Sequence, residues 1–164
     1  MTIELRHADQ RTFEWLSGGD MPAGAPALCP GGIAPSEVLP IIARMAANVR
    51  AGFAGESAWL VVADGEAVGL ISYKRAPQDG SADIGYGIAA SREGRGFATD
   101  AVRVLARQAC AGGIARLTAE TSLANRPSQR VLEKAGFERI GAREDAEDGP
   151  LVCWALDLPE GSED

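Results

Sequence analysis

A strand, a glycine-rich turn and a helix follow one another without interruption over residues 82–109. From Ile84 to Ile88, large side chains alternate with small residues, which is the period-two pattern of a β-strand. Residues 93–98 read Glu-Gly-Arg-Gly-Phe-Ala, and their two glycines allow the backbone to turn tightly and to lie open to a ligand. From Thr99 onward, the apolar residues recur with the period of a helix.

A helix that begins directly behind such a turn has unpaired N–H groups and the positive end of its dipole at its N-terminus. Both features favour the binding of a phosphate group. The stretch therefore predicts a phosphate-binding turn and leaves open which ligand carries the phosphate.

Composition restricts the remaining possibilities. The 164 residues are 46% hydrophobic and 24% charged, so we expect one globular domain over residues 1–158 and a frayed acidic tail over 159–164. No apolar run could span a membrane and the first residues lack the layout of a signal peptide, which favours the cytoplasm. The net charge of −7 argues against a general nucleic-acid binder. Three cysteines without metal-site or CxxC spacing predict reduced thiols and no metal site.

The order of the predicted elements defines a fold class. The predicted strands cover residues 2–6, 58–63, 67–73, 84–88, 114–121, 137–143 and 151–158, and the predicted helices follow Asp9, Ser36, Ala98 and Asn125. Asp9, Ser36 and Asn125 are the predicted N-caps. This order predicts an α+β domain with a mixed, mostly antiparallel central sheet of about seven strands and about four flanking helices. A doubly wound dinucleotide fold would instead place the glycine turn in an early βαβ unit.

Three motifs carry a resemblance to a known family. They are Ile84-Gly-Tyr86, the run Gly-Arg-Gly-Phe-Ala-Thr-Asp-Ala at 94–101, and Asn125-x-x-Ser128 followed by Glu-Lys-Ala-Gly-Phe at 133–137. With this order and spacing, the chain resembles the GCN5-related N-acetyltransferase (GNAT) superfamily over nearly its whole length. Within the superfamily it is similar to the branch of the ribosomal-protein alanine N-acetyltransferases. One departure is Glu93, where the family's turn has glutamine or arginine.

The resemblance implies the GNAT fold and acetyl-CoA as the cofactor. The end of the strand, residues 88–90, would splay from its neighbour and pair with the amides of the pantetheine arm. Backbone N–H groups of residues 95–99 would hold the pyrophosphate. The implied cofactor-binding residues are Ile88, Ala89, Ala90, Arg95, Gly96, Phe97, Ala98, Thr99, Asn125 and Arg130.

Acetyl transfer to an amine needs support for the developing oxyanion, a proton for the leaving thiolate and a base for the amine. A backbone N–H near Ile88 or Ala89 could support the oxyanion. Many members of the superfamily donate the proton from a tyrosine in the helix after the asparagine, but that position is Leu132 here. In the ribosomal-protein branch, a serine at the position of Ser128 is the proposed donor. The alternative is that Ser128 only bonds locally in the first helical turn.

Three carboxylates are candidates for the base. Glu120 aligns with a glutamate that relatives use, directly or through water, Glu147 lies about where the ribosomal-protein branch carries another, and Asp83 is the third. Each could instead be a surface acid that attracts a cationic amine. We assign Tyr86 and Tyr73 to packing within the sheet.

The resemblance implies an N-acetyltransferase that acts on the α-amine of a protein or peptide N-terminus. Two alternatives remain: an acetyltransferase for a small amine such as an amino acid, polyamine or antibiotic, and a module that binds acetyl-CoA without catalysis. Residues 18–35 have no period and are predicted to form a loop, either a flexible insertion or a wall over the acceptor site. We expect a monomer or a homodimer.

Overall fold

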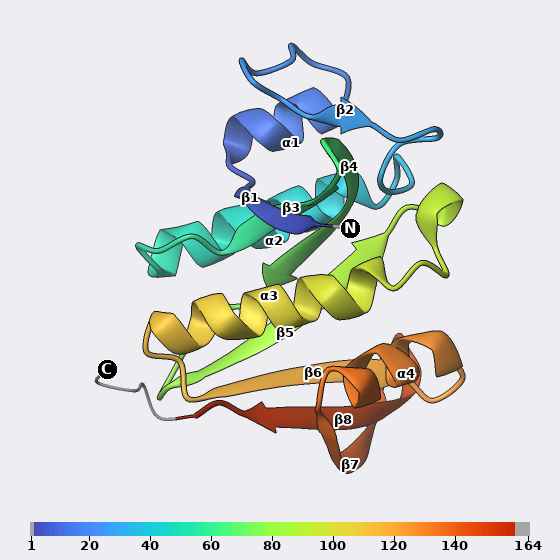
Figure 1. Cartoon of the computed structure of the whole chain (residues 1–164). Helices are drawn as coiled ribbons and strands as arrows, with labels where there is room; N and C mark the ends of the chain where they lie inside the picture. The colour runs from blue at the N-terminus through green and yellow to red at the C-terminus, as the bar shows by residue number, and fades with distance from the viewer. Residues whose placement is uncertain (1, 160–164) are drawn as a thin grey trace.

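The structure of the chain, a computed structural model, describes residues 2–159, and the predicted tail beyond Pro159 lies outside the described residues. Strands and helices follow in the mixed order expected from the sequence (Figure 1). Their bounds are β1 Ile3–His7, α1 Gln10–Leu16, β2 Ala27–Leu28, α2 Leu39–Gly52, β3 Ala58–Ala63, β4 Glu66–Tyr73, β5 Ser81–Ile88, the 3-10 helix η1 Ala90–Arg92, α3 Phe97–Ala111, β6 Arg116–Ser122, α4 Arg126–Lys134, β7 Glu138–Asp145 and β8 Gly149–Asp157.

Within residues 2–159, eight strands form one mixed sheet. Its order is β1-β3-β4-β5-β6-β8-β7, and β2 pairs with β4 beside this path. Neighbouring strands are antiparallel except in the β5–β6 and β2–β4 pairs, which are parallel. The predicted α+β class with a mostly antiparallel sheet is therefore confirmed. The sequence did not predict β2, which has only two residues and lies inside the loop expected over 18–35.

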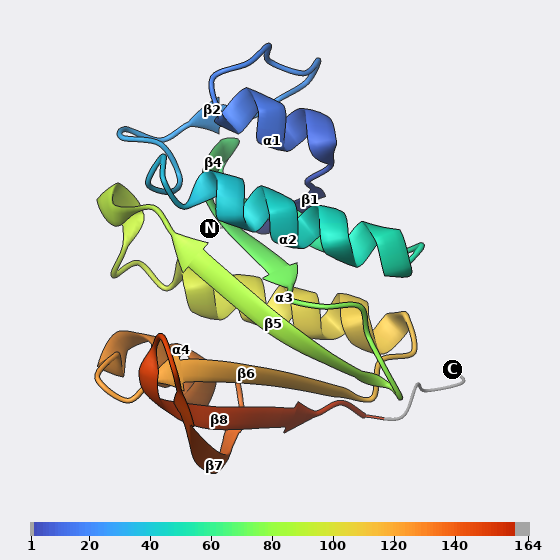
Figure 2. The same ribbon diagram turned by 180° about the vertical axis from the view of Figure 1, so that it is seen from behind.

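The helices cover the sheet unevenly. On one face, α3 and α4 pack over a buried cluster that reaches from β3 to β8 and contains Ile71, Leu105 and Leu117. On the other face, α1 and α2 enclose a second cluster with β3 and β4, around Phe13 and Leu60. Figure 2 shows this side, and there β5, β6 and β8 have no helix in front of them. We call this α2-side surface of β5, β6 and β8 the open face.

Local signals account for several boundaries. Asp9 caps α1 as predicted, and its Oδ1 accepts the N–H of Thr12 at 3.0 Å in a capping box. In the turn between β3 and β4, Asp64 and Gly65 have positive φ values of 50° and 80°. Positive φ at both central residues gives the turn the twist that matches an antiparallel hairpin.

The predicted cap of the second helix is wrong. The helix begins at Leu39, after the N-cap Val38, and no side chain caps it. The hydroxyl of Ser36 donates instead to Glu37 at 3.3 Å. Pro40 lies in the first turn, where a missing N–H leaves no helical hydrogen bond unmade.

The three cysteines are free, as predicted. Within residues 2–159, no helix combines the length and the apolar character that crossing a membrane requires.

Candidate active site

The parallel pairing of β5 with β6 ends halfway along both strands. It runs from Ser81 opposite Arg116 to Ile84 opposite Ala119. Beyond that point, β5 pairs only with β4 and β6 pairs only with β8. The two strands therefore diverge and leave an opening in the sheet, as Figure 2 shows. The splay expected at the end of β5 begins earlier, directly after Ile84.

The backbone of Ile88 faces this opening. In an antiparallel pair, residues that exchange hydrogen bonds alternate with residues that do not. The Ala89 N–H donates to Val68 O at 2.7 Å, so Ile88 and Gly69 form a pair of the second kind. The N–H and C=O of Ile88 therefore point away from β4 and toward the opening. Of the two N–H groups expected to support an oxyanion, that of Ala89 is already used within the sheet.

The turn after β5 contains two residues in the left-handed conformation. Gly94 and Gly96 have φ values of 78° and 80°, which residues with a Cβ adopt only with strain. Gly96 is the N-cap of α3, and no side chain caps this helix. Its first N–H groups therefore lack partners within the helix. The helix begins at Phe97, two residues before the predicted Thr99, because Gly96 already completes the turn.

A cavity of about 550 Å³ lies in front of this helix end and extends along β5 to α4. We call it the cofactor cavity, and Ser128 is part of its wall. Seven of the ten predicted cofactor-binding residues line it: Ile88, Gly96, Phe97, Ala98, Thr99, Asn125 and Arg130. The other three do not line it. Ala89 is buried with the α1–α2 cluster, Ala90 begins η1, and Arg95 is exposed in the turn.

Charged side chains surround the cofactor cavity. Arg92, Arg130 and Lys134 line it together with the carboxylate of Glu93. Arg92 binds Glu66 on β4 through both Nε, at 2.7 Å, and Nη2, at 3.1 Å. This hydrogen bond holds the pKa of Glu66 below its usual value. Arg92 therefore ties the glycine turn to β4, while Arg130 and Lys134 supply positive charge on the α4 side.

Ser128 is held in the first turn of α4. Asn125 caps this helix as predicted, and its Oδ1 accepts the Ser128 N–H at 3.2 Å. The Oγ of Ser128 lies 2.8 Å from the hydroxyl of Tyr86. The Tyr86 hydroxyl also donates to the carbonyl oxygen of Ser128 at 3.1 Å. Leu132, one turn further along α4, is fully buried.

Three residues of this site were missed by sequence reasoning, namely Lys134, Arg143 and Tyr86, and Tyr86 is the one in contact with Ser128. The sequence placed it in the sheet, where it does lie, but not on the wall of the cofactor cavity. The sequence did contain a signal for this position: Tyr86 lies two residues after Ile84, whose side chain is buried under α3. Side chains two residues apart on a strand share a face, so Tyr86 had to lie on the α3 side as well.

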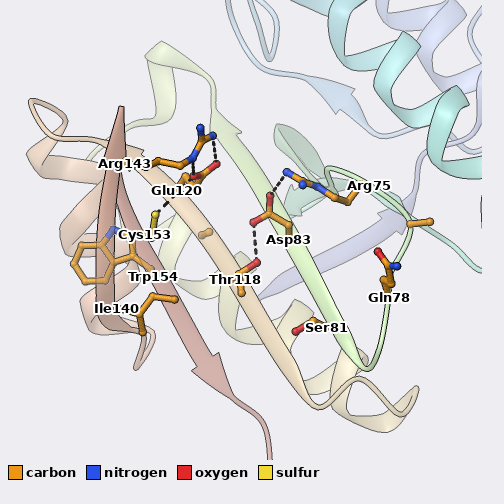
Figure 3. Close-up of a pocket in the computed structure, with 12 residues that line it drawn as sticks. Arg75, Gln78, Ser81, Asp83, Thr118, Glu120, Ile140, Arg143, Cys153 and Trp154 are labelled. Atoms are coloured by element: carbon orange, nitrogen blue, oxygen red, sulfur yellow. Dashed lines mark hydrogen bonds and ion pairs between the residues drawn. The ribbon is translucent and has the colours of Figure 1, made fainter. Parts of the chain in front are cut away.

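Glu120 lies on the open face, on the other side of the opening (Figure 3). It lines a second cavity, of about 410 Å³, together with Asp83, Arg143 and Cys153. Arg143 donates to both carboxylate oxygens of Glu120, through Nε and through Nη2, the latter at 2.9 Å. This hydrogen bond holds the pKa of Glu120 below its usual value. Burial raises the pKa of the Cys153 thiol, whose Sγ lies 3.7 Å from Glu120.

The other two candidate bases occupy different positions. Asp83 lies on the open face, where its carboxylate accepts from Arg75 at 3.1 Å and from Thr118 at 2.9 Å. Glu147 is exposed in the turn between β7 and β8 and lines neither cavity. Its N–H donates to Asp145 at 2.8 Å. Among the predicted catalytic residues, Ser128 and Glu120 thus lie on the two sides of one opening, and Glu147 lies apart from both cavities.

These features define a class of protein. A glycine turn and an uncapped helix end suit a phosphate-bearing cofactor on one side of a splayed sheet, and a second cavity lies on the other side. The family model of the acetyltransferase (GNAT) domain matches residues 3–138. The chain therefore belongs to the GNAT acetyltransferase family and is an acetyl-CoA-dependent enzyme. No sequence among the curated proteins matches it.

Solved structures share the fold. RimL, a ribosomal L7/L12 α-N-protein acetyltransferase in complex with coenzyme A, superposes with a TM-score of 0.70 at 19% identity, over 96% of this chain and 95% of that one. RimJ of Mycobacterium smegmatis, in complex with CoA-disulfide, gives 0.68 at 24% identity, over 97% and 85%. The aminoglycoside acetyltransferase AAC(6')-Ib in complex with coenzyme A gives 0.65 at 22% identity, over 95% of both chains.

Proposed function

We propose that this protein transfers the acetyl group of acetyl-CoA to the α-amine of a protein or peptide N-terminus. The observation that carries the proposal is the opening between β5 and β6, with Ser128 on the cofactor cavity and Glu120 on the open face. An acetyl donor in the cofactor cavity and an amine on the open face would meet at this opening. Holding two reactants in such an arrangement lowers the entropic part of the barrier.

Acetyl-CoA fits the cofactor cavity by charge. The N–H groups of residues 97–99 and the side chains of Arg130 and Lys134 are suited to its phosphates, and a Cβ at Gly94 or Gly96 would point into empty space. Acetyl-CoA supplies the acetyl group as a thioester, whose sulfur leaves with a proton. The N–H of Ile88 is the proposed donor to the developing oxyanion, because it faces the opening.

Ser128 and Glu120 have complementary roles in this proposal. Ser128 donates the proton to the leaving sulfur from a hydroxyl on the cavity wall. Glu120 accepts the proton of the amine, directly or through a water molecule. The hydrogen bonds from Arg143 lower the pKa of Glu120, so its carboxylate is ionised at neutral pH, as a proton acceptor must be. Glu147 is the second candidate for this role.

The shape of the open face favours the end of a peptide. The 410 Å³ cavity and a neighbouring one of about 470 Å³ share Arg75, Glu120 and Arg143, so together they form one groove. The side chains of Arg75 and Arg143 are 69% and 48% exposed, which leaves the groove open along its length. Sites for small ligands usually enclose most of the ligand. An extended chain end would suit this groove better than an isolated small amine.

A polycationic small amine is the second candidate acceptor. The turn between β7 and β8 is acidic, and Asp145 and Asp148 line the groove. Carboxylates at the rim of a groove attract cations and raise the rate of their encounter. Acceptor kinetics separate this candidate from the first.

A panel of acceptors tests the proposed function. Thiol release from acetyl-CoA should be measured with short peptides that have a free N-terminus, with the same peptides blocked at the N-terminus, and with free amino acids, polyamines and aminoglycosides. We expect the highest kcat/KM for free N-termini and none for the blocked peptides. Turnover of small amines without turnover of any peptide would contradict the peptide acceptor. Binding of acetyl-CoA without turnover of any acceptor would contradict the proposal that the protein catalyses acetyl transfer.

Replacing Ser128 by alanine should lower kcat while the affinity for acetyl-CoA stays close to that of the wild type. General acid catalysis contributes about 10²-fold or more to a rate, and the loss should be of that order. Steady-state kinetics with a peptide acceptor, combined with calorimetric titration of acetyl-CoA, give both quantities. An unchanged kcat would remove Ser128 from the chemistry.

A further inference from the structure

We infer that Tyr86 is a positioning residue for the reaction: its hydroxyl holds the Ser128 hydroxyl in the orientation from which Ser128 gives up its proton. The inference deepens the proposed function and rests on it. Tyr86 and Ser128, which are in contact, lie 42 positions apart in the chain. The Tyr86 hydroxyl on β5 lies 2.8 Å from Ser128 Oγ in the first turn of α4, and both side chains line the cofactor cavity.

Ser128 is held at three of its atoms. Its N–H donates to Asn125 Oδ1 at 3.2 Å, which is the ordinary cap of a helix. Its carbonyl oxygen and its Oγ both contact the Tyr86 hydroxyl, at 3.1 and 2.8 Å. A residue in the first turn needs only the first of these contacts for the helix to form. The other two fix its carbonyl group and its hydroxyl relative to β5. The backbone of Ile88 on the same strand faces the opening.

The geometry lets Tyr86 hold Ser128 before and after the proton leaves. While the Tyr86 hydroxyl donates to the Ser128 carbonyl oxygen, its own oxygen accepts the hydrogen bond of the Ser128 hydroxyl. When the Tyr86 O–H turns to Ser128 Oγ, the Ser128 proton is released toward the cavity. The Ser128 oxygen then gains a donor just as it becomes negative, and hydrogen bonds to charged atoms are the strong ones. The change is a rotation of the two hydroxyl groups about their C–O bonds and moves no heavy atom.

The protons are transferred between the same groups as in the proposed function. The Ser128 proton goes to the leaving sulfur and is replaced from solvent, while Tyr86 keeps its own proton throughout. Burial raises the pKa of Tyr86, and this outweighs the opposite effect of its hydrogen bond with Ser128. The phenol is therefore neutral at physiological pH and can both donate and accept.

Tyr73 on β4 is the natural comparison. It is also a strand tyrosine, fully buried where Tyr86 is half-buried, and burial raises the pKa of its hydroxyl as well. Its ring packs edge to face against Trp59, at a centroid distance of 5.3 Å, and against Phe53, at 6.3 Å. It does not line the cofactor cavity. Tyr73 thus shares the packing role of Tyr86 and lacks its contact with the proposed proton donor.

The test compares Tyr86→Phe with Tyr73→Phe in steady-state kinetics with acetyl-CoA and the best peptide acceptor. The concentration of active sites is set by the calorimetric stoichiometry of acetyl-CoA binding, so that a partly unfolded variant is counted correctly. We expect Tyr86→Phe to lower kcat about tenfold, the value of one hydrogen bond to a charged group, and to leave the Kd for acetyl-CoA unchanged. Tyr73→Phe should leave both unchanged.

A double-mutant cycle separates positioning from packing. Because Tyr86 acts through Ser128, Tyr86→Phe should cause no further loss of kcat in the Ser128→Ala background. An equal loss in both backgrounds, or a wild-type kcat in Tyr86→Phe, would overturn the inference and leave the proposed function standing. If the wild type transfers no acetyl group to any acceptor, the proposed function fails and the inference fails with it.

Discussion

The contact between Glu120 and Arg143 controls the charge of Glu120 on the open face. Arg143 donates to both oxygens of Glu120 and contacts Asp145 at 3.4 Å. A carboxylate held in this way keeps its charge to lower pH than a free one, since protonation would break the hydrogen bonds. As the proposed base, Glu120 therefore keeps its charged form to lower pH because Arg143 is beside it.

Replacing Arg143 by glutamine should move the acidic limb of the pH profile of kcat/KM to higher pH. The hydrogen bond from Arg143 is the largest cause of the lowered pKa of Glu120, so that pKa rises when the guanidinium is removed. The variant then loses a proton acceptor at acidic pH that the wild type keeps, and the difference shrinks as the pH rises. Measuring kcat/KM from acidic to neutral pH gives the position of the limb.

Arg116→Gln is the matched control, because Arg116 pairs with Asp157 at 3.1 Å at the far end of β6. It removes the same charge without touching Glu120 and should leave the limb in place. An equal shift in both variants would assign the effect to net charge. No shift in Arg143→Gln would contradict the role of Glu120 and make Glu147→Gln the variant to measure.

The sequence predicted site residues that belong to motifs and missed contacts between distant segments. Asn125 caps α4 as its position before Arg-Pro-Ser predicted, because a cap is a local interaction. The contact of Tyr86 with Ser128 and that of Arg143 with Glu120 depend on how strands and helices pack. Nothing in the residues next to them in the sequence encodes these pairings.

At the scale of elements, the glycine turn and the start of α3 are the proposed structural basis of cofactor binding. Gly96 reverses the chain in the left-handed conformation, and the helix begins with the next residue. The positions of the first N–H groups of α3 therefore depend on the backbone of Gly96. A change there should act on the ligand more than on the fold.

Replacing Gly96 by alanine should weaken acetyl-CoA binding. A Cβ at Gly96 meets no atom within 4 Å, so the substitution introduces backbone strain and no clash. That strain is about 1–2 kcal/mol, and a shift of the first turn of α3, which moves its N–H groups, relieves it. Calorimetric titration with acetyl-CoA measures the affinity, and thermal unfolding measures the strain.

Gly65→Ala is the matched control, because it introduces the same backbone strain in a different turn. Gly65 has the same φ of 80° and the same empty surroundings, but it lies in the β3–β4 turn. Both variants should lower Tm to a similar extent, and only Gly96→Ala should lower the affinity. If both bind acetyl-CoA as tightly as the wild type, the turn does not position the phosphates.

Element boundaries were predictable where a strong local signal ends or begins an element. The hairpin around Asp64 and Gly65 is of this kind. The start of α2 was not, because Ser36 matched the composition of a cap while the chain makes a further turn before Leu39. The strand β2 could not be predicted for another reason. Two residues are too few to show the period of a strand, and they form one only because they pair with the edge of β4.

At the scale of the whole molecule, the sheet has a buried cluster on both faces at its β3–β4 side and on one face elsewhere. The fold class could be predicted because the order of the strands and helices can be read along the sequence. The open face could not, because it depends on where α1 and α2 come to rest after folding. The proposed site for the acceptor is therefore the part that sequence patterns predicted least well.

Replacing Leu105 by alanine should reduce the free energy of unfolding by about 2–5 kcal/mol, the usual cost of removing a fully buried leucine. Leu105 lies on the buried side of α3, in the larger cluster. Denaturant unfolding followed by circular dichroism measures the change. Ile41→Ala is the control, since Ile41 is 62% exposed on α2 and its loss should change stability by no more than about 0.5 kcal/mol. Equal losses in the two variants would contradict the assignment of the core.

The position of the acetyl group on a doubly reactive peptide decides whether the protein is an N-terminal acetyltransferase. The peptide should carry a free N-terminus and an internal lysine, and it should be fragmented in a mass spectrometer after incubation with the enzyme and acetyl-CoA. We expect acetylation of the α-nitrogen of the first residue alone, and a strongly reduced yield with Ser128→Ala. Acetylation of the lysine alone, or an unmodified peptide from an enzyme that binds acetyl-CoA, would contradict it.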